Sequence, residues 1–149
     1  MLFDIVECPS MTAGGGGNGY VSLILVSHSA PIAEGLAELV AQVAGPDVPI
    51  VAIGGASDGS LGTDGGKVLD ALRTAAAGPG GVVLMDLGSS VLAVRAAQAE
   101  LSPQELERLV VADAPLVEGA VAAGVAASTG SAPDDIAAAA REARSVSKL

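Results

Sequence analysis

An aliphatic run, Val21–Val26, is the feature that most restricts the fold of this chain. A run of this length, rich in β-branched residues and bounded by polar ones, is typical of a strand that is buried on both faces. Strands of this kind belong to parallel sheets, in which ligands gather beyond the carboxyl ends of the strands. The run is followed by Ser27, His28 and Ser29, and His28 is the only histidine of the chain. We therefore expect the one side chain that titrates near neutral pH to lie at a crevice.

Strand and helix patterns alternate along the rest of the chain. Further strands are predicted at 48–53, 82–85 and 109–112. Helices are predicted at 31–44, after Thr63 as the N-cap, at 89–101, after Ser102, at 115–129 and at 133–144. The first of these helices carries its large apolar residues at helical spacing: Ile32, Leu36, Leu39, Val40 and Val43. This alternation predicts an α/β fold with a doubly wound, mainly parallel sheet in the simplest order, 2-1-3-4. In that order the loops after the first and third strands share one crevice, which brings His28 towards Asp86.

The chain divides into two unequal parts. At 149 residues it is most simply one domain. Residues 1–20 contain a glycine-rich tract at 14–19 and are predicted to be a disordered extension, which leaves 21–149 as the folded domain. No apolar stretch approaches the roughly 18 uncharged residues that span a bilayer, and no basic region marks a signal peptide. We expect a cytoplasmic protein.

Composition excludes several functions. The only aromatic residues are Phe3 and Tyr20, so a platform for stacking nucleic-acid bases is not expected. A formal net charge of −10 opposes binding to phosphate backbones and anionic membranes, and it favours a basic protein partner. The one cysteine, Cys8, has no partner for an internal disulfide. With one histidine and one cysteine, no metal site of the usual zinc type is expected.

The residues that follow the first and third strands could support nucleophilic chemistry at His28. The ring could accept a phosphoryl group on one nitrogen while Asp86 orients the other. We predict that the phosphoryl oxygens are bound by hydroxyl and amide donors of Ser29, Gly88, Ser89 and Ser90.

Other interpretations of these residues remain open. A triad of Ser89, His28 and Asp86 is conceivable, although no G-x-S-x-G elbow frames a serine. The same residues are also typical of an ordinary turn followed by a helix cap.

Four segments together resemble one protein family. They are Val26–Ser29, Gly62–Asp64, Met85–Ser89 and Ala114–Gly119, in this order and at similar spacing. They are similar to the phosphotransferase subunit of the phosphoenolpyruvate-dependent dihydroxyacetone kinase, which is related to the mannose-type enzyme IIA of the bacterial sugar phosphotransferase system. The resemblance covers about residues 21–145.

The resemblance implies a homodimeric phosphotransferase that works as a relay. It would accept phosphate from the phosphocarrier protein HPr and pass it to ADP held on the nucleotide-binding kinase subunit. The ATP so formed would phosphorylate dihydroxyacetone on a third subunit. His28 falls at the phosphorylated histidine and Asp86 at the carboxylate that orients it, with Thr63 and Pro115 as further lining of the site. No cofactor is expected on this chain, because ADP, ATP and magnesium would belong to the partner subunit.

Two other functions compete with this one. The chain could be the enzyme IIA component of a sugar permease, which would pass phosphate to a membrane-associated IIB domain. It could also be a non-catalytic regulator whose phosphorylation state reports sugar supply. Some relatives continue into fused HPr-like and enzyme-I-like domains; this chain ends at Leu149, so it is expected to use separate donors.

Overall fold

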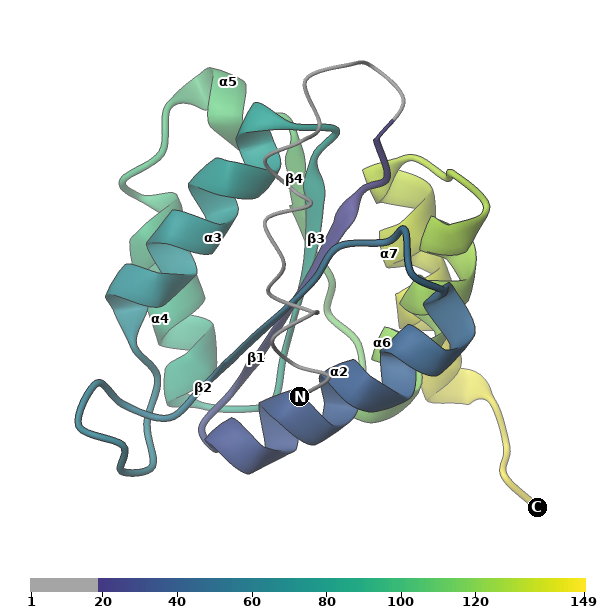
Figure 1. Cartoon of the computed structure of the whole chain (residues 1–149), viewed down its shortest axis with the longest axis horizontal. Coiled ribbons are helices and arrows are strands. Elements are labelled where there is room, and N and C mark those ends of the chain that lie inside the picture. Colours follow the sequence, from purple (N-terminus) through teal and green to yellow (C-terminus); the bar gives the residue numbers. More distant parts are fainter. Residues whose placement is uncertain (1–18) are drawn as a thin grey trace.

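The computed structural model describes residues 19–149, which form alternating strands and helices (Figure 1). The strands are β1 (Ser22–Ser27), β2 (Ile50–Gly54), β3 (Gly81–Met85) and β4 (Leu109–Val111). The α-helices are α2 (Ala30–Ala44), α3 (Gly65–Ala77), α4 (Ser89–Gln98), α5 (Pro103–Leu106), α6 (Leu116–Ser128) and α7 (Pro133–Glu142), followed by the short 3-10 helix η2 (Ala143–Ser145). The predicted extension at 1–20 lies, up to residue 18, outside the described residues and remains a prediction.

The four strands form one parallel sheet in the order β2-β1-β3-β4, which confirms the predicted fold class and strand order. In the register of the sheet, Ser27 at the end of β1 pairs with Gly54 at the end of β2. Val26 pairs with Met85 at the end of β3. The three strands therefore end side by side, and the loops that leave them share one edge of the sheet.

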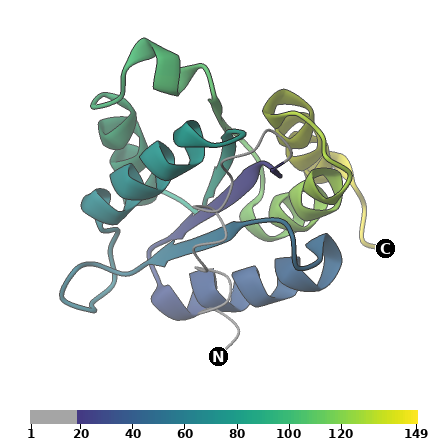
Figure 2. The same cartoon turned by 45° about the horizontal axis from the view of Figure 1, so that its top comes forward.

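Helices cover both faces of the sheet, and the side chains of β1 point alternately into the two cores that result (Figure 2). Leu23 and Leu25 pack into a core shared with α2, α6 and α7, whereas Ile24 and Val26 pack into a core shared with α3 and α4. All six residues of β1 are buried, which confirms that this strand is covered on both sides. Among residues 19–149, no helix is both long enough and apolar enough to cross a membrane.

The buried face of α2 contains only some of the large apolar residues that the helical spacing assigned to it. Leu36 and Val40 are buried, but Ile32, Leu39 and Val43 are each more than 40% exposed. Small residues explain the difference, because Ala33, Ala37 and Ala44 complete the buried stripe of α2 and allow its neighbours to come close. A Cβ atom at Gly124 of α6, for example, would lie only 2.8 Å from the Cγ1 atom of Val40.

Two helix starts bear on the site. The N-cap of α3 is Asp64, whose carboxylate accepts from the N–H groups of Gly66 and Lys67, so the prediction that Thr63 caps this helix was wrong. Asp64 is the better cap because its carboxylate also favours the positive end of the helix dipole. At α4 the N-cap is Gly88, and no side chain caps this helix by a hydrogen bond.

A close backbone contact fixes the turn between β1 and α2. A Cβ atom at Gly54 would lie 2.4 Å from the carbonyl oxygen of Ser29 and 2.8 Å from the Cα atom of Ala30. Real Cβ atoms do not approach backbone so closely, so only glycine fits at this position. The end of β2 thus supports the turn that carries His28.

Candidate active site

His28 and Asp86 meet at the shared edge of the sheet, each directly beyond the end of its strand. The Nδ1 atom of His28 lies 2.9 Å from the Oδ1 atom of Asp86. The N–H group of Asp86 donates to the carbonyl of Val26 at 3.0 Å, which continues the pairing of β1 with β3 into the site. The expected proximity of these two residues is therefore present, and it follows from the strand order.

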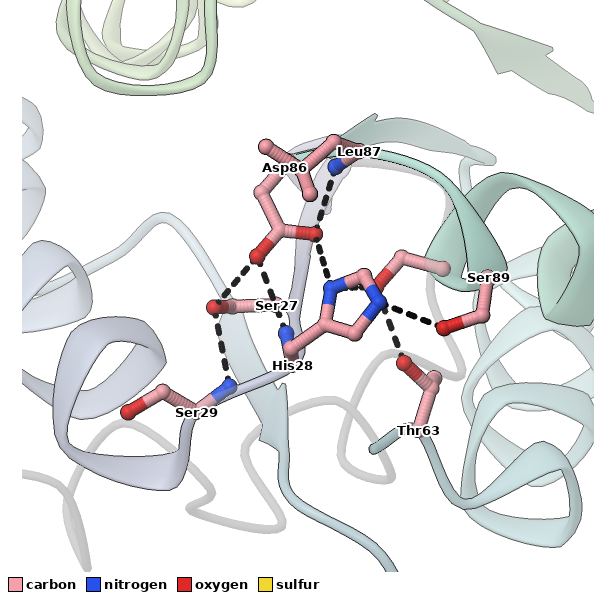
Figure 3. A network of polar contacts seen from close by, with 8 residues as sticks. Ser27, His28, Ser29, Thr63, Asp86, Leu87 and Ser89 are labelled. Carbon is pink, nitrogen blue, oxygen red and sulfur yellow. Dashed lines mark hydrogen bonds and ion pairs between the residues drawn. The ribbon is translucent and has the colours of Figure 1, made fainter. Parts of the chain in front are cut away.

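The carboxylate of Asp86 accepts hydrogen bonds on both oxygens (Figure 3). Oδ1 accepts from the N–H group of Leu87 at 2.6 Å in addition to the contact with the imidazole. Oδ2 accepts from the Ser27 hydroxyl at 2.8 Å and from the backbone N–H of His28 at 2.9 Å. This number of donors fixes both the position and the rotation of the carboxyl group.

The same hydrogen bonds keep Asp86 ionised. Burial alone would raise the pKa of the carboxyl group. The donors from His28, Leu87, Ser27 and Ser90 outweigh burial and hold the pKa of Asp86 well below its ordinary value of 3.8. At neutral pH the carboxyl group of Asp86 therefore carries a full negative charge beside the imidazole.

An ionised Asp86 determines which ring nitrogen of His28 carries the proton when the ring is neutral. A carboxylate can only accept a hydrogen bond, so the Nδ1 atom of a neutral ring carries the proton and Nε2 keeps its lone pair. Nε2 points away from Asp86 and contacts the hydroxyl of Ser89 (Figure 3). The His28 side chain is 26% exposed, so the ring is held on one side and open on the other.

Ser27 is a site residue that the sequence analysis did not identify. Its side chain is fully buried, donates to Asp86 and accepts from the N–H group of Ser29 at 3.1 Å. A signal was present in the sequence, because a polar residue at the end of a buried strand needs a hydrogen-bond partner. The pattern could not say that this partner would be the carboxylate of Asp86.

Ser90 and Thr63 lie beside the ring, on the Nδ1 side. The Ser90 hydroxyl is 3.2 Å from Nδ1 of His28 and 2.8 Å from the hydroxyl of Thr63. Ser90 is fully buried, and its N–H group donates to the carbonyl of Leu87. Its donors are thus engaged inside the protein, which favours a role in positioning the ring over the predicted contact with phosphate. Thr63 reaches the ring through Ser90.

The other predicted phosphate-binding residues differ in the hydrogen-bond donors that they leave free for an anion. The Ser29 hydroxyl accepts from the N–H group of Ile32 at 3.5 Å and serves as the N-cap of α2. Gly88 and Ser89 are exposed at the start of α4. Within residues 19–149, no group accepts a hydrogen bond from the N–H groups of these two residues. Two amide donors at a helix start are therefore available to an anion.

Pro115 lies beyond the end of β4, at the same edge of the sheet. It is the N-cap of α6, and its carbonyl accepts from the N–H group of Gly119 at 2.8 Å. This contact shapes the start of α6 and gives Pro115 no hydrogen bond to His28. Its predicted part in lining the site remains a prediction.

The loops at the carboxyl edge of the sheet are acidic. They comprise residues 28–29, 55–64, 86–88 and 112–115, and within them the charged side chains are Asp58, Asp64, Asp86 and Asp113. None of these loops contains a lysine or an arginine. Within the described part of the chain, no group of three or more His, Cys, Asp or Glu residues could hold a metal ion. The groups beside the carboxylate of Asp86 are an oriented imidazole, hydroxyl groups and backbone amides.

Comparison with known proteins finds relatives among the components of phosphotransferase systems. A family model described as the PTS system fructose IIA component matches residues 22–137. The phosphoryl donor subunit DhaM of the PEP-dependent dihydroxyacetone kinase 2 from Listeria innocua is 39% identical over 105 residues, which cover 70% of this chain and 84% of the relative. The corresponding subunit from Escherichia coli is 36% identical over 119 residues, which cover 78% of this chain but only 25% of the relative.

Two further proteins also match over most of this chain. The phosphotransferase subunit DhaM of the PTS-dependent dihydroxyacetone kinase from Lactococcus lactis is 34% identical over 101 residues, which cover 68% of this chain and 77% of the relative. The crystal structure of a protein of unknown function, EF1359, superimposes with a TM-score of 0.73 at 34% identity and covers 86% of this chain and 95% of its own. The described fold and nearly the whole of that solved chain thus correspond.

Proposed function

Because the chain belongs to the family of the PTS system fructose IIA component, we propose that it is a phosphohistidine relay that serves as the phosphoryl donor subunit of a dihydroxyacetone kinase. The observation that carries this proposal is the pairing of His28 with an ionised Asp86 at an exposed edge of the sheet. The DhaM relatives, at up to 39% identity, support the kinase as the system in which the relay works.

In the first step, the lone pair of Nε2 of His28 attacks the phosphorus atom of a phosphorylated donor. The new P–N bond forms as the bond between phosphorus and the donor breaks, and the donor leaves with its electron pair. The proton on Nδ1 stays in its hydrogen bond to Asp86, which stabilises the positive charge that grows on the ring. We propose HPr as this donor.

The phosphoryl oxygens would then lie beyond Nε2, where Ser89 contacts the ring. The Ser89 hydroxyl turns from the nitrogen to an oxygen, and the N–H groups of Gly88 and Ser89 complete a neutral anion site at the start of α4. Ser29 supports the turn from which His28 projects. Ser90 and Thr63 hold the ring on the Nδ1 side.

In the second step, an oxygen of the terminal phosphate of ADP attacks the phosphorus atom and displaces Nε2, which regenerates the neutral ring and yields ATP. We propose that ADP and magnesium are bound by the partner kinase subunit, that ATP then phosphorylates dihydroxyacetone, and that this chain holds no cofactor of its own. We further propose that it acts as a cytoplasmic homodimer, for which light scattering would give twice the mass of the chain.

Labelling tests the relay directly. The chain is incubated with radiolabelled phosphoenolpyruvate, enzyme I and HPr, and the same reaction is run with the His28→Ala variant. We expect label on the parent only, and we expect it to be lost in acid but kept in alkali, unlike a phosphoserine at Ser27, Ser29 or Ser89. A labelled variant, or an unlabelled parent, contradicts the proposal.

A second function, enzyme IIA of a sugar permease, is favoured by the description of the matching family as a fructose IIA component. The two functions differ in the acceptor. Transfer of label to an ADP-bearing kinase subunit supports the kinase, whereas transfer to a IIB domain supports the permease. A regulator would transfer its label to neither, so steady formation of dihydroxyacetone phosphate in the reconstituted system contradicts that third function.

A further inference from the structure

A cavity of about 270 Å³ lies at the amino edge of the sheet, which is the edge opposite His28. Its wall comes from three places: the residues that enter β1, the loop between α2 and β2, and the end of α3 with the loop that follows it. Three prolines contribute to this wall: Pro46, Pro49 and Pro79. Sites for small molecules usually enclose about 300–1,000 Å³, so this cavity is suited to a ligand smaller than most.

A buried hydroxyl group belongs to the wall. Ser22, the first residue of β1, lines the cavity and is only 3% exposed. Its N–H group donates to the carbonyl of Gly80 at 3.0 Å, but within residues 19–149 no group forms a hydrogen bond with its hydroxyl. A buried polar group without a partner is costly, so a ligand that supplies one would be favoured here.

The end of α3 presents a carbonyl oxygen to the cavity. The N–H group of Gly78 donates to the carbonyl of Ala75 at 3.1 Å, so the carbonyl of Thr74 lacks the donor that a regular helix would give it. The Thr74 hydroxyl donates to the carbonyl of Asp70 at 2.8 Å and is not a free donor. The last turn of α3 contains no basic residue, so the partial negative charge at this helix end is not neutralised within the helix.

Asp47 adds a carboxylate to the same wall. It is exposed, and within the described part of the chain it forms no ion pair. No lysine or arginine lines the cavity, although Arg108 donates to the carbonyl of Gly78 at 3.1 Å. The polar groups of the wall therefore favour a ligand that donates hydrogen bonds and carries a positive charge.

The apolar part of the wall distinguishes between kinds of cation. A metal ion needs several oxygen ligands around it, and prolines offer no side-chain ligand. Among residues 19–149, no group of three or more His, Cys, Asp or Glu residues could hold a metal ion. A cation with an apolar body can use both parts of the wall, because its charge faces the acceptors and its body packs against the prolines.

We propose that this cavity binds a small organic ammonium ion, namely a primary amine with a short apolar body. Its three N–H groups donate to acceptors among Asp47, Thr74 and Ser22. The proposal does not rest on the relay function, because the cavity and His28 lie at opposite edges of the sheet.

The test uses benzylamine as the probe and benzyl alcohol as its neutral counterpart of similar shape. Each is titrated into the full ¹⁵N-labelled chain at neutral pH, and the backbone amide signals are followed by NMR. We expect benzylamine to bind saturably with a Kd of about 1 mM or lower, and benzyl alcohol to bind about fivefold or more weakly. The largest shifts are expected at the amides of Tyr20, Ser22, Asp47, Ala75 and Gly78.

Two variants and a control test the assigned acceptors. Asp47→Asn is expected to raise the Kd for benzylamine by about fivefold or more, and Ser22→Ala by about threefold. Asp134→Asn on α7 removes another exposed carboxylate, which does not line the cavity, and should leave the Kd within about twofold of the parent. Because Asp47 is exposed, its substitution tests the proposal even where Ser22→Ala does not fold.

Each contrary result has a definite meaning. Equal binding of benzylamine and benzyl alcohol, or an unchanged Kd in Asp47→Asn, overturns recognition of the cation. Shifts confined to other parts of the chain, or no saturable shift up to about 20 mM benzylamine, show that the cavity is not an amine site. Labelling of Asp47→Asn by phosphorylated HPr should match the parent in every case, so failure of this proposal leaves the relay untouched.

Discussion

Asp86 binds His28 twice, once through the ring and once through the main chain. Oδ1 lies 2.9 Å from Nδ1 of the imidazole, and Oδ2 accepts from the backbone N–H of the same residue, also at 2.9 Å. The carboxylate therefore fixes the ring relative to its own backbone and leaves it little freedom to rotate. An imidazole held in this way can present Nε2 repeatedly in one direction, as transfer between two proteins requires.

Replacing Asp86 by Asn is expected to lower the rate of phosphoryl transfer by about 100-fold or more. The amide can donate to Nδ1, which would move the ring proton to Nε2 and remove the lone pair that attacks phosphorus. The measurement is the initial rate of labelling by phosphorylated HPr. Asp47→Asn, at the opposite edge of the sheet, is the control and should match the parent; a fully active Asp86→Asn variant would exclude the orienting role.

Ser27→Ala is expected to reduce stability by about 1–3 kcal/mol and transfer by about tenfold, because Oδ2 of Asp86 loses a buried donor. Ser22→Ala is the matched control, since Ser22 is also buried and lies at the other end of the same strand. Urea unfolding and labelling rates are measured for both. Equal effects of the two substitutions would show that Ser27 matters only as a part of the strand.

Gly54→Ala is expected to destabilise the protein by about 1–3 kcal/mol, because its Cβ atom would meet the backbone of Ser29 and Ala30 and displace the turn that carries His28. The transfer rate should fall with it. Gly35→Ala on α2 has open space around the added atom and should stabilise the protein by about 0.5–1 kcal/mol. Thermal or urea unfolding compares the two, and a neutral Gly54→Ala would contradict the close packing of this turn.

The free energy of unfolding should depend on pH in a way that reflects the lowered pKa of Asp86. Its pKa in the folded protein is lowered, so its contribution to stability is complete above the unfolded pKa of about 3.9 and is lost as the pH falls towards the folded pKa. The stability difference between the parent and Asp86→Asn should therefore be largest above about pH 5 and shrink below about pH 4. Urea unfolding of both proteins at pH 7, 5 and 3 measures this difference in stability. The contributions of the other carboxylates cancel in the difference, because both proteins contain them. A difference that stays constant over this range would contradict the lowered pKa.

The strand order and the meeting of His28 with Asp86 could be predicted from the sequence, because both follow from where buried strands end. A strand whose central residues are all aliphatic must be covered on both faces, and the residue after its last buried position lies at the edge of the sheet. The alternation of strands and helices then restricts the possible orders to a few.

Hydroxyl side chains were harder to place. Ser27 and Ser90 are buried while Ser89 is exposed, and the sequence alone does not distinguish between these serines. Their roles depend on which hydroxyl faces the carboxylate and which faces solvent, and that is decided by a fraction of a turn at the start of α4. The N-cap of α3 was misplaced by one residue for a similar reason, since Thr63 and Asp64 are both suitable caps.

The exposed residues of α2 show a further limit. Helical spacing identifies a stripe of apolar residues, but small residues can contribute to a core as well as large ones. Alanines fill the closely packed side of this helix, which leaves Ile32 and Leu39 outside. Large side chains that look like core residues in a sequence can then belong to the surface.

The absence of lysine and arginine from the four loops at the edge of the sheet has an energetic consequence for the proposed intermediate. A phosphoryl group brings a charge of about −1.5 to −2, and these loops themselves offer it only hydroxyls and amides. An arginine would bind the group bidentately and make it a stable modification. Without such a cation in these loops, the phosphorylated chain would remain a high-energy species that favours transfer of the phosphoryl group to the next acceptor.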